Sequence, residues 1–358
     1  KLEKKAQASD ARLEDFLAAI QASPNGVVLL DASGRIEWSN LTAANQLGFD
    51  PQRDLGQYVR NMVRNPAFTA YLTGGDFGHE IQIDGVGPRP TQPTRISLQI
   101  HPYGKKRKLM LTRDVTAVQL AETMRRDFVA NVSHEIRTPL TVLSGFVETM
   151  QSIPLEEADR TRYLGLMSQQ AHRMQTLVSD LLTLSRLEGS PSPGPGEWID
   201  SEELLMHVVQ EARGLTQAIS ATVHQIEPVP GPSIWVSGAK TELLSAMSNL
   251  LSNAVRYTPG GGLIQTGWRL RSDGWGEFFV KDTGPGIAAE HLPRLTERFY
   301  RVDRSRSRET GGTGLGLAIV KHVAQRHGGH IDAESTVGEG SRFAIALPPN
   351  RVRERVTG

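Results

Sequence analysis

The chain has 358 residues, which is more than one ordinary folding core holds, so its length predicts about two or three domains. Its 40 basic and 39 acidic side chains give a net charge of +1, which argues against bulk binding of nucleic acid or of an anionic membrane surface. The chain contains no cysteine, so disulfides, thiol nucleophiles and thiolate metal sites are excluded, and a reducing compartment is favoured.

The first 23 residues are charged and rich in alanine, with Leu13, Phe16, Leu17 and Ile20 spaced as on one face of an amphipathic helix that ends before Pro24. From 24 to 116 the pattern changes to short strands, which predicts a small α+β domain. The expected strands are "GVVLLD", "RIEWSN", "HEIQID", "RISLQIHP" and "KLMLTRDVT". A helical stretch, "LTAANQLGFD", follows the second of them, and turns are expected from there to Gly78.

Residues 117–189 show two apolar stripes at spacings of three and four, which predicts two long helices with a break near Pro154. The first stripe contains Phe128, Val132, Ile136, Leu140, Leu143, Val147 and Met150, and the second contains Leu164, Met167, Ala171, Met174, Val178 and Leu181. Two helices with one stripe each do not enclose a core. We therefore expect an antiparallel hairpin that pairs with a second copy into a four-helix bundle, which makes the protein a homodimer.

A linker rich in Gly, Pro and Ser follows at 190–196 and marks a domain boundary. Residues 197–350 then predict an α/β sandwich, and 351–358 are expected to be a tail. Helices are expected near 201–219, 241–257 and 315–327, and strands near 263–271, 276–282 and, as a pair, 330–347.

The segment "FVANVSHEIRTPL" places His134 on the face of its helix opposite the apolar stripe. Glu135 adjoins it, Thr138 lies one turn further along the same face, and Pro139 removes a backbone donor. A neutral imidazole is a good nucleophile when a carboxylate accepts its Nδ1 proton, although a lone surface histidine is more often without a role. Thr138 stands where the zinc protease motif requires a second histidine, so that alternative is excluded.

A second motif, "NLLSNAVRYTPGG", sets Asn249, Asn253, Arg256, Tyr257 and Glu242 along one polar stripe of a helix. Leu243, Met247, Leu250, Leu251 and Ala254 form the neighbouring apolar stripe. Amide oxygens are hard metal ligands and arginine offers charge to phosphate, so this helix suits a Mg²⁺–nucleotide site. Taken alone, the pattern fits a plain amphipathic helix equally well.

Two glycine motifs complete the set. "KDTGPGI" ends a predicted strand at Asp282, and "GGTGLGLAIVKHV" runs a glycine loop into a predicted helix, where backbone N–H groups approach phosphates easily. The loop has no Gly-Lys-Ser/Thr, which excludes a P-loop, and Leu317 stands where the dinucleotide fingerprint has its third glycine.

In this order the four motifs resemble the H, N, G1 and G2 boxes of sensor histidine kinases, and "ERFYRVD" at 297–303 resembles their F box. The resemblance covers roughly 118–348. It implies a dimerisation and histidine-phosphotransfer domain followed by an ATP-binding domain of the Bergerat fold. It further implies transfer of the γ-phosphoryl group of ATP to histidine and then to an aspartate of a response regulator's receiver domain, with the regulator's dephosphorylation as a second activity.

Carried over to matching positions, the resemblance makes His134 the phosphoryl acceptor, Glu135 its orienting base, and Thr138 the residue that positions water for dephosphorylation. Asn253 would hold Mg²⁺ with help from Asn249, and Arg256 would face the phosphates where many relatives have lysine. Asp282 would accept the adenine amino group beside Tyr257. The remaining nucleotide-binding residues would be Gly284, Gly286, Gly312, Gly314, Leu315 and Gly316.

Residues 24–116 resemble a PAS sensor domain, with "DVT" at 114–116 where such domains usually lead into the signalling helix. Two longer segments, 36–68 and 293–322, look like the corresponding segments of phosphate-regulon sensor kinases. Such a kinase would be the cytoplasmic portion of an inner-membrane protein. No run of about 18 apolar residues occurs here, and the chain opens on Lys1 rather than Met, so we expect the membrane segment outside this chain. The arginine-rich stretch 288–312 is expected to be a lid over the nucleotide.

Three alternatives remain at this point. The chain could serve the same chemistry for another signal, it could be a scaffold whose ATP domain has decayed, or it could be an ATPase chaperone of the same fold. The ATPase families carry a water-activating glutamate one turn before the magnesium asparagine. Here that residue is Asn249, which is no base.

Overall fold

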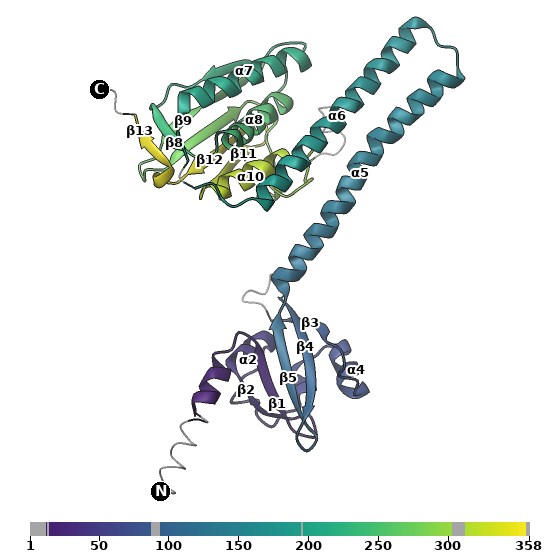
Figure 1. Cartoon of the computed structure of the whole chain (residues 1–358), viewed down its shortest axis with the longest axis vertical. Coiled ribbons are helices and arrows are strands. Elements are labelled where there is room, and N and C mark those ends of the chain that lie inside the picture. Colours follow the sequence, from purple (N-terminus) through teal and green to yellow (C-terminus); the bar gives the residue numbers. More distant parts are fainter. Residues whose placement is uncertain (1–11, 13, 87–93, 195, 303–311, 356–358) are drawn as a thin grey trace. The chain divides into compact units, whose positions relative to one another are not determined.

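The computed structural model describes residues 12, 14–86, 94–194, 196–302 and 312–355, and its contacts divide the chain into two units, Lys1–Val129 and Ala130–Gly358 (Figure 1). Within the described residues, no helix is both long enough and apolar enough to span a bilayer. The predicted N-terminal helix is present at 14–21.

The first unit is built on an antiparallel sheet in the order β2-β1-β5-β4-β3, and all five strands are the predicted ones. Their bounds are β1 Gly26–Leu30, β2 Ile36–Ser39, β3 Ile81–Gly85, β4 Thr94–Tyr103 and β5 Arg107–Asp114. Met110 of β5 lies opposite Val28 of β1 and Ile100 of β4, and all three side chains are fully buried. This triple register fixes which face of the sheet forms the core.

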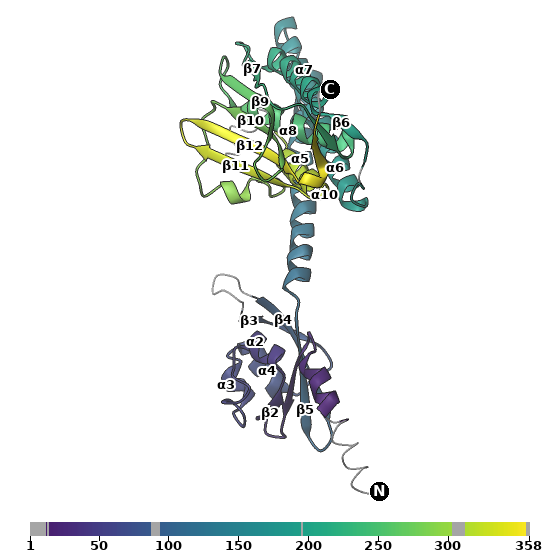
Figure 2. The ribbon, with the colours of Figure 1, turned by 90° about the vertical axis from the view of Figure 1, so that its left-hand side faces the viewer.

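Three helices gather on one face of this sheet: α2 Leu41–Leu47, α3 Val59–Met62 and α4 Pro66–Gly74 (Figure 2). The first was predicted. The expectation of turns up to Gly78 was wrong, because α3 and α4 occupy part of that stretch. The start of α4 follows ordinary capping chemistry: Asn65 Oδ1 accepts from the N–H of Ala67 at 2.9 Å, and Pro66 needs no donor at the first position.

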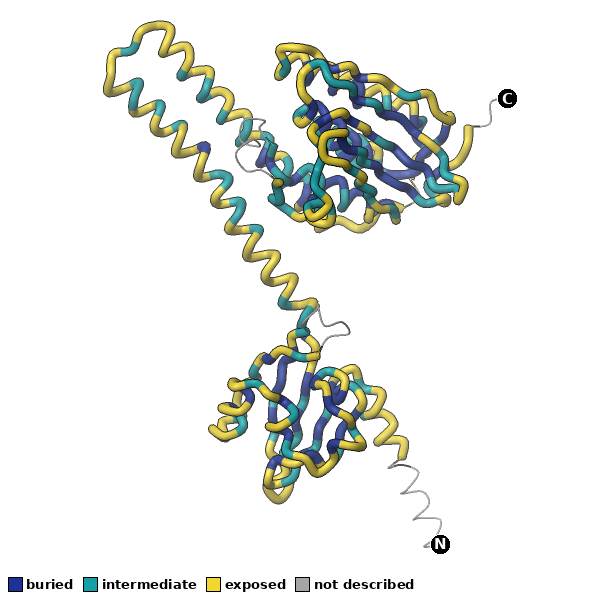
Figure 3. The backbone as a smooth tube through the Cα atoms, turned by 180° about the vertical axis from the view of Figure 1, so that it is seen from behind, coloured by how far each residue is buried: buried dark blue, intermediate teal, exposed yellow. Residues whose placement is uncertain are grey.

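The second unit begins within the first helix of a hairpin, α5 Thr116–Ser152, which is followed by α6 Glu157–Gly189. Helix α5 continues through Pro139, which is buried, and the predicted break near Pro154 is confirmed. Most of the hairpin is exposed along its length, in contrast to the α/β parts of the molecule (Figure 3). Its exposed apolar side chains include Leu140, Val147, Leu164 and Val178.

The rest of this unit has a five-stranded sheet in the order β11-β12-β10-β9-β7, in which only the pairing of β7 with β9 is parallel. The strands are β7 Gln225–Pro228, β9 Leu263–Leu270, β10 Gly276–Asp282, β11 His330–Thr336 and β12 Gly340–Leu347. Three helices pack side by side against it: α7 Ser201–Ile219, α8 Lys240–Tyr257 and α10 Gly316–Arg326. The predicted α/β layering of 197–350 is therefore found here.

A second, three-stranded sheet, in the order β13-β8-β6, was not predicted. Its strands are β6 Trp198–Asp200, β8 Ile234–Ser237 and β13 Val352–Glu354, and short 3-10 helices lie at Leu292–Arg294 and Pro349–Arg351. The expected tail at 351–358 needs correction, because β13 pairs with β8 and Val352 is only 7% exposed. Strands of three or four residues are too short to leave a clear periodic signal in the sequence.

Candidate functional site

Helix α8 presents two different faces, as its sequence predicts. Its apolar residues Leu243, Met247, Leu250, Leu251 and Ala254 are at most 4% exposed and lie in the core against the sheet and the two neighbouring helices. With that face fixed, the polar stripe is forced to the other side. Asn249, Asn253, Arg256 and Tyr257 consequently line a cavity of about 490 Å³.

The cavity lies between α8, the end of β10, and the glycine loop that precedes α10. Most of the predicted nucleotide-binding residues line it: Asn249, Asn253, Arg256, Tyr257, Asp282, Gly286, Gly312, Gly314 and Gly316. Gly284 and Leu315 do not line it. Gly284 donates its backbone N–H to Asp282 Oδ1 at 2.8 Å, and the side chain of Leu315, the residue that caps the start of α10, is fully buried.

Asp282 ends strand β10 as a carboxylate that is 7% exposed. Burial raises the pKa of this carboxyl above its ordinary value, and the backbone N–H groups of Gly284 and Ser341 oppose that rise. A buried acceptor in a cavity wall is costly unless a donor meets it. The position suits recognition of an amino group such as that of adenine.

Glycine is needed where the cavity's loops pass close to other parts of the chain. Gly286 has φ +70°, and a Cβ there would lie 2.0 Å from the carbonyl oxygen of Thr336. At Gly316 a Cβ would lie 2.6 Å from Asn249 Oδ1. Side chains at these two positions would push the walls of the cavity apart.

The amide and guanidinium groups supply the polar chemistry of the other wall. Asn249 Nδ2 donates to the carbonyl of Ser245 at 2.8 Å, which leaves its oxygen near the first turn of α10. Burial lowers the pKa of Arg256, while Tyr257 and Asp180 oppose that change, and the group stays cationic. Among the described residues no three His, Cys, Asp or Glu side chains cluster as a metal site. Mg²⁺ bound through Asn253 and nucleotide phosphates needs no such cluster, so these residues fit it.

The predicted phosphotransfer residues lie on α5, and none of the three lines this cavity. His134 and Thr138 are exposed, and the Thr138 hydroxyl donates to the His134 carbonyl at 3.1 Å. Glu135 does not hold the imidazole here. Its carboxylate pairs with Arg173 of α6 at 3.1 Å and lies 3.8 Å from Arg301. The structure thus assembles the nucleotide residues but does not bring His134 to them.

Several residues of the cavity were missed from the sequence. Helix α6 contributes Thr176 and Asp180, and other missed polar residues include Ser252, Thr313 and Ser341. No sequence pattern marks the two α6 residues as part of the cavity, because they reach it only through the packing of the hairpin against α10. Conversely, Glu242 belongs to the polar stripe of α8 but does not line the cavity. Its carboxylate pairs instead with Arg326 of α10 at 2.9 Å.

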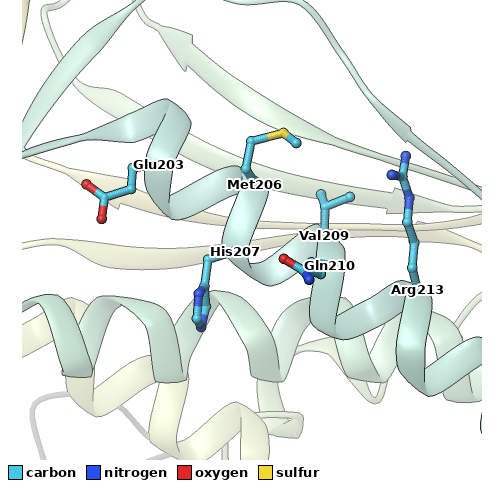
Figure 4. Close-up of a pocket in the computed structure, with 6 residues that line it drawn as sticks. All are labelled: Glu203, Met206, His207, Val209, Gln210 and Arg213. Carbon is cyan, nitrogen blue, oxygen red and sulfur yellow. The ribbon is translucent and has the colours of Figure 1, made fainter.

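The predicted lid is only partly described. Leu295, Tyr300, Arg301 and Val302 line the cavity, whereas Arg304, Arg306 and Arg308 lie outside the described residues. A separate hollow of about 360 Å³ follows the outer surface of α7, where Figure 4 shows the six lining side chains on that one helix. None of the predicted site residues lies in it.

Comparison with known proteins places two families along the chain. Residues 124–190 match the model of the "His Kinase A (phospho-acceptor) domain", and 238–351 match that of the "Histidine kinase-, DNA gyrase B-, and HSP90-like ATPase". The chain is 43% identical over 360 aligned residues to the phosphate regulon sensor protein PhoR of Pseudomonas aeruginosa, covering 99% of this chain and 79% of that protein. It is 31% identical to PhoR of Haemophilus influenzae, covering 92% of this chain and 75% of that one.

Among solved structures, the histidine kinase ThkA, crystallised in complex with the response regulator protein TrrA, shares the fold at 19% identity. The match has a TM-score of 0.50 and covers 90% of this chain and 95% of that one. The matched domains, the ATP-site geometry and the identity to whole relatives agree. The chain belongs to the sensor histidine kinases, the ATP-dependent protein-histidine kinases of two-component systems, and over nearly its full length it is similar to the phosphate regulon sensor kinases.

Proposed function

We propose that this kinase phosphorylates His134 from ATP bound in the α8 cavity, passes the phosphoryl group to an aspartate of a response regulator, and also dephosphorylates that regulator. The observation that carries the proposal is the cavity itself, where a buried carboxylate, two amides and a guanidinium converge beside a glycine loop. Asp282 would accept the adenine amino group with Tyr257 beside the ring, and Asn249 and Arg256 would face the phosphates. The catalytic gain would come from positioning and charge neutralisation.

Asn253 is proposed to hold Mg²⁺, which supplies neutralisation of phosphate charge. The other steps belong to side chains of this chain. His134 is the nucleophile through Nε2, with Glu135 accepting the Nδ1 proton. Because Glu135 is paired with Arg173 and lies near Arg301, we propose that it must leave these arginines before it can orient the imidazole.

The direct test is transfer of label from γ-labelled ATP with Mg²⁺, followed by acid and base treatment of the product, since phosphohistidine is acid-labile and stable to base. The His134→Gln variant is expected to take up no label. His172→Gln is the matched control, because His172 is also an exposed histidine of the hairpin. Equal labelling of parent and His134→Gln would overturn the assignment.

We also propose that the hairpin forms a four-helix bundle with a second copy. Support comes from exposed apolar side chains on both helices, among them Leu140 at 52% and Leu164 at 49% exposure. Sedimentation velocity would report a dimer in the parent and a monomer in a Leu140→Glu, Leu164→Glu variant. A monomeric parent at micromolar concentration would contradict this part of the proposal.

Phosphate limitation is proposed as the signal, on the strength of the PhoR relatives, and the first unit is proposed to be a PAS sensor domain. The response regulator partner is supported by the ThkA structure. As in the sequence-based expectation, we propose that a segment outside this chain anchors the kinase to the inner membrane with this part in the cytoplasm. Comparing transfer rates to several purified receiver domains would identify the partner, as the one labelled fastest.

An ATPase without histidine transfer is the alternative, because the matched domain family includes HSP90-like ATPases. Asn249 speaks against it, since an amide does not activate water. Phosphate release from ATP that continues unchanged in His134→Gln would favour the ATPase.

A further inference from the structure

An acidic side chain from the hairpin enters the nucleotide cavity. Asp180 of α6 lines the same cavity as Asn253 and Arg256, and its Oδ2 accepts a hydrogen bond from the Thr313 hydroxyl at 2.6 Å. Thr313 belongs to the glycine loop "GGTGLG" and is only 8% exposed. A carboxylate from another domain therefore contacts the loop whose backbone is suited to phosphate.

The insertion of Asp180 is held by contacts further along the same helix. The Arg326 guanidinium of α10 donates to the carbonyls of Leu187 at 2.8 Å and Ser190 at 2.6 Å. Glu188 pairs with Arg298 and lies 3.5 Å from His322. These contacts dock α6 on the catalytic domain, the α/β part at 197–350. Asp180 lies in the cavity because the whole end of α6 is docked in this way.

Asp180 has the chemistry of a stand-in for an anionic ligand. It is partly buried, and burial raises its pKa, while the Thr313 hydroxyl and the Arg256 charge act in the opposite direction. The Thr313 hydroxyl and the Arg256 guanidinium, which both favour the Asp180 carboxylate, are groups that an incoming phosphate would also use. The Asp180 carboxylate and the phosphates of a bound nucleotide would be anions in the same cavity, where burial strengthens their mutual repulsion.

We propose that Asp180 competes with the phosphates of the nucleotide for Thr313 and Arg256, so that docking of α6 and tight binding of a triphosphate oppose each other. By linkage, ATP then weakens the docked arrangement by the same factor by which docking weakens ATP binding. Release from α6 frees the catalytic domain, which in the docked arrangement does not present its cavity to His134. The inference rests on the proposed function, because it takes the glycine loop and Arg256 as the phosphate end.

The test measures affinity by titration calorimetry, with Mg²⁺ present, for a non-hydrolysable ATP analogue, for ADP and for adenosine. Asp180→Asn keeps an oxygen that accepts from Thr313 and removes only the charge. We expect it to bind the ATP analogue at least about fivefold more tightly than the parent, ADP with a smaller gain, and adenosine unchanged. Asp159→Asn, at the exposed start of α6, makes the same change of charge far from the cavity and is expected to bind like the parent.

Unchanged or weaker binding of the ATP analogue by Asp180→Asn would overturn the inference, and weaker binding with a lost Mg²⁺ dependence would make Asp180 a metal ligand instead. An equal gain for adenosine would also overturn it, since adenosine has no phosphate. Failure of every protein to bind any of the three ligands would reject the proposed ATP site itself, which is a distinguishable result.

A second measurement needs no substitution. Hydrogen exchange of the unmodified chain should show faster exchange across 176–188 of α6 with the ATP analogue than with adenosine. Slower or equal exchange there with the ATP analogue would contradict the proposed opposition between docking and binding.

Discussion

Helix α8 and the two hairpin helices each have an apolar stripe at helical spacing, but the stripe of α8 is buried, whereas apolar side chains of the hairpin are exposed. Leu250 of α8 is 2% exposed, whereas Leu140 of α5 and Leu164 of α6 are 52% and 49% exposed. An apolar stripe at helical spacing therefore tells which face has to be buried, but not what covers it. Within one chain a sheet and two helices cover the stripe of α8, and a partner is the proposed cover for the hairpin.

The two regions also differ in how firmly their polar faces are set. On α8, burial of the apolar stripe forces Asn249, Asn253 and Arg256 into the cavity. On α5 the polar face meets solvent, and the carboxylate of Glu135 is engaged by arginines of other elements. We infer that the α8 wall of the nucleotide site is preformed, while the phosphotransfer site depends on rearrangement.

The largest effect is expected on the preformed side. Asn253→Ala removes a proposed metal ligand from the cavity wall and should lower autophosphorylation about 100-fold or more, with little change in thermal stability. The matched control is Ser248→Ala, on the same helix but contacting Glu211 of α7 outside the cavity, and its activity should stay near that of the parent. Undiminished labelling of Asn253→Ala would remove the metal role.

The second prediction tests the two stripes against each other. Leu250→Ala leaves a cavity in a closed core and should cost about 2–5 kcal/mol of unfolding free energy at any protein concentration. Leu140→Ala should cost little in a dilute monomer and should instead raise the dimer dissociation constant. Thermal unfolding over a hundredfold range of concentration separates the two cases, and identical concentration dependence in both variants would refute the proposed bundle.

The same contrast explains what the sequence could and could not predict. Long periodic elements such as α7, α8 and α10 were predicted within a residue or two, because each has its own apolar stripe. Strands β6, β7, β8 and β13 were missed, since three or four residues leave little periodic signal and their pairing is set by the fold. In the site, motif residues of α8 and β10 were predicted, whereas Asp180 and Thr176 reach the cavity only through docking of α6, which spacing does not encode.

The third prediction concerns the exposed face of α5. Thr138→Ala deletes a hydroxyl that donates to the His134 carbonyl, and folding should hardly change. If this hydroxyl positions water, dephosphorylation of the regulator should slow at least about tenfold, while autophosphorylation stays within about twofold. The matched control is Thr141→Ala. Thr141 lies about one turn after Thr138, and its hydroxyl donates in the same way to the carbonyl four residues earlier, that of Arg137. Equal loss of both activities in Thr138→Ala would contradict the division of roles.

The smallest effect is expected from a histidine that the catalytic domain buries, in contrast to the exposed His134. His327 is 1% exposed, its Nδ1 donates to the Val323 carbonyl at 2.8 Å, and its Nε2 accepts from the Ala239 N–H at 3.1 Å. These two bonds require the neutral ring. Burial lowers the pKa of His327 below its ordinary value, although the nearby Glu242 opposes that shift.

Because the folded-state pKa lies below that of the unfolded chain, the unfolded state binds the proton first as pH falls. The stability that neutral His327 contributes is therefore complete above pH of about 6.5 and declines as the pH drops toward the folded-state pKa. We expect the Tm of the parent to fall by a few degrees between pH 7.5 and 5.5. His327→Gln should have a lower Tm at pH 7.5 and a smaller drop. Since burial also lowers the pKa of His322, the difference between parent and variant is what isolates His327, and parallel pH profiles would assign the effect elsewhere.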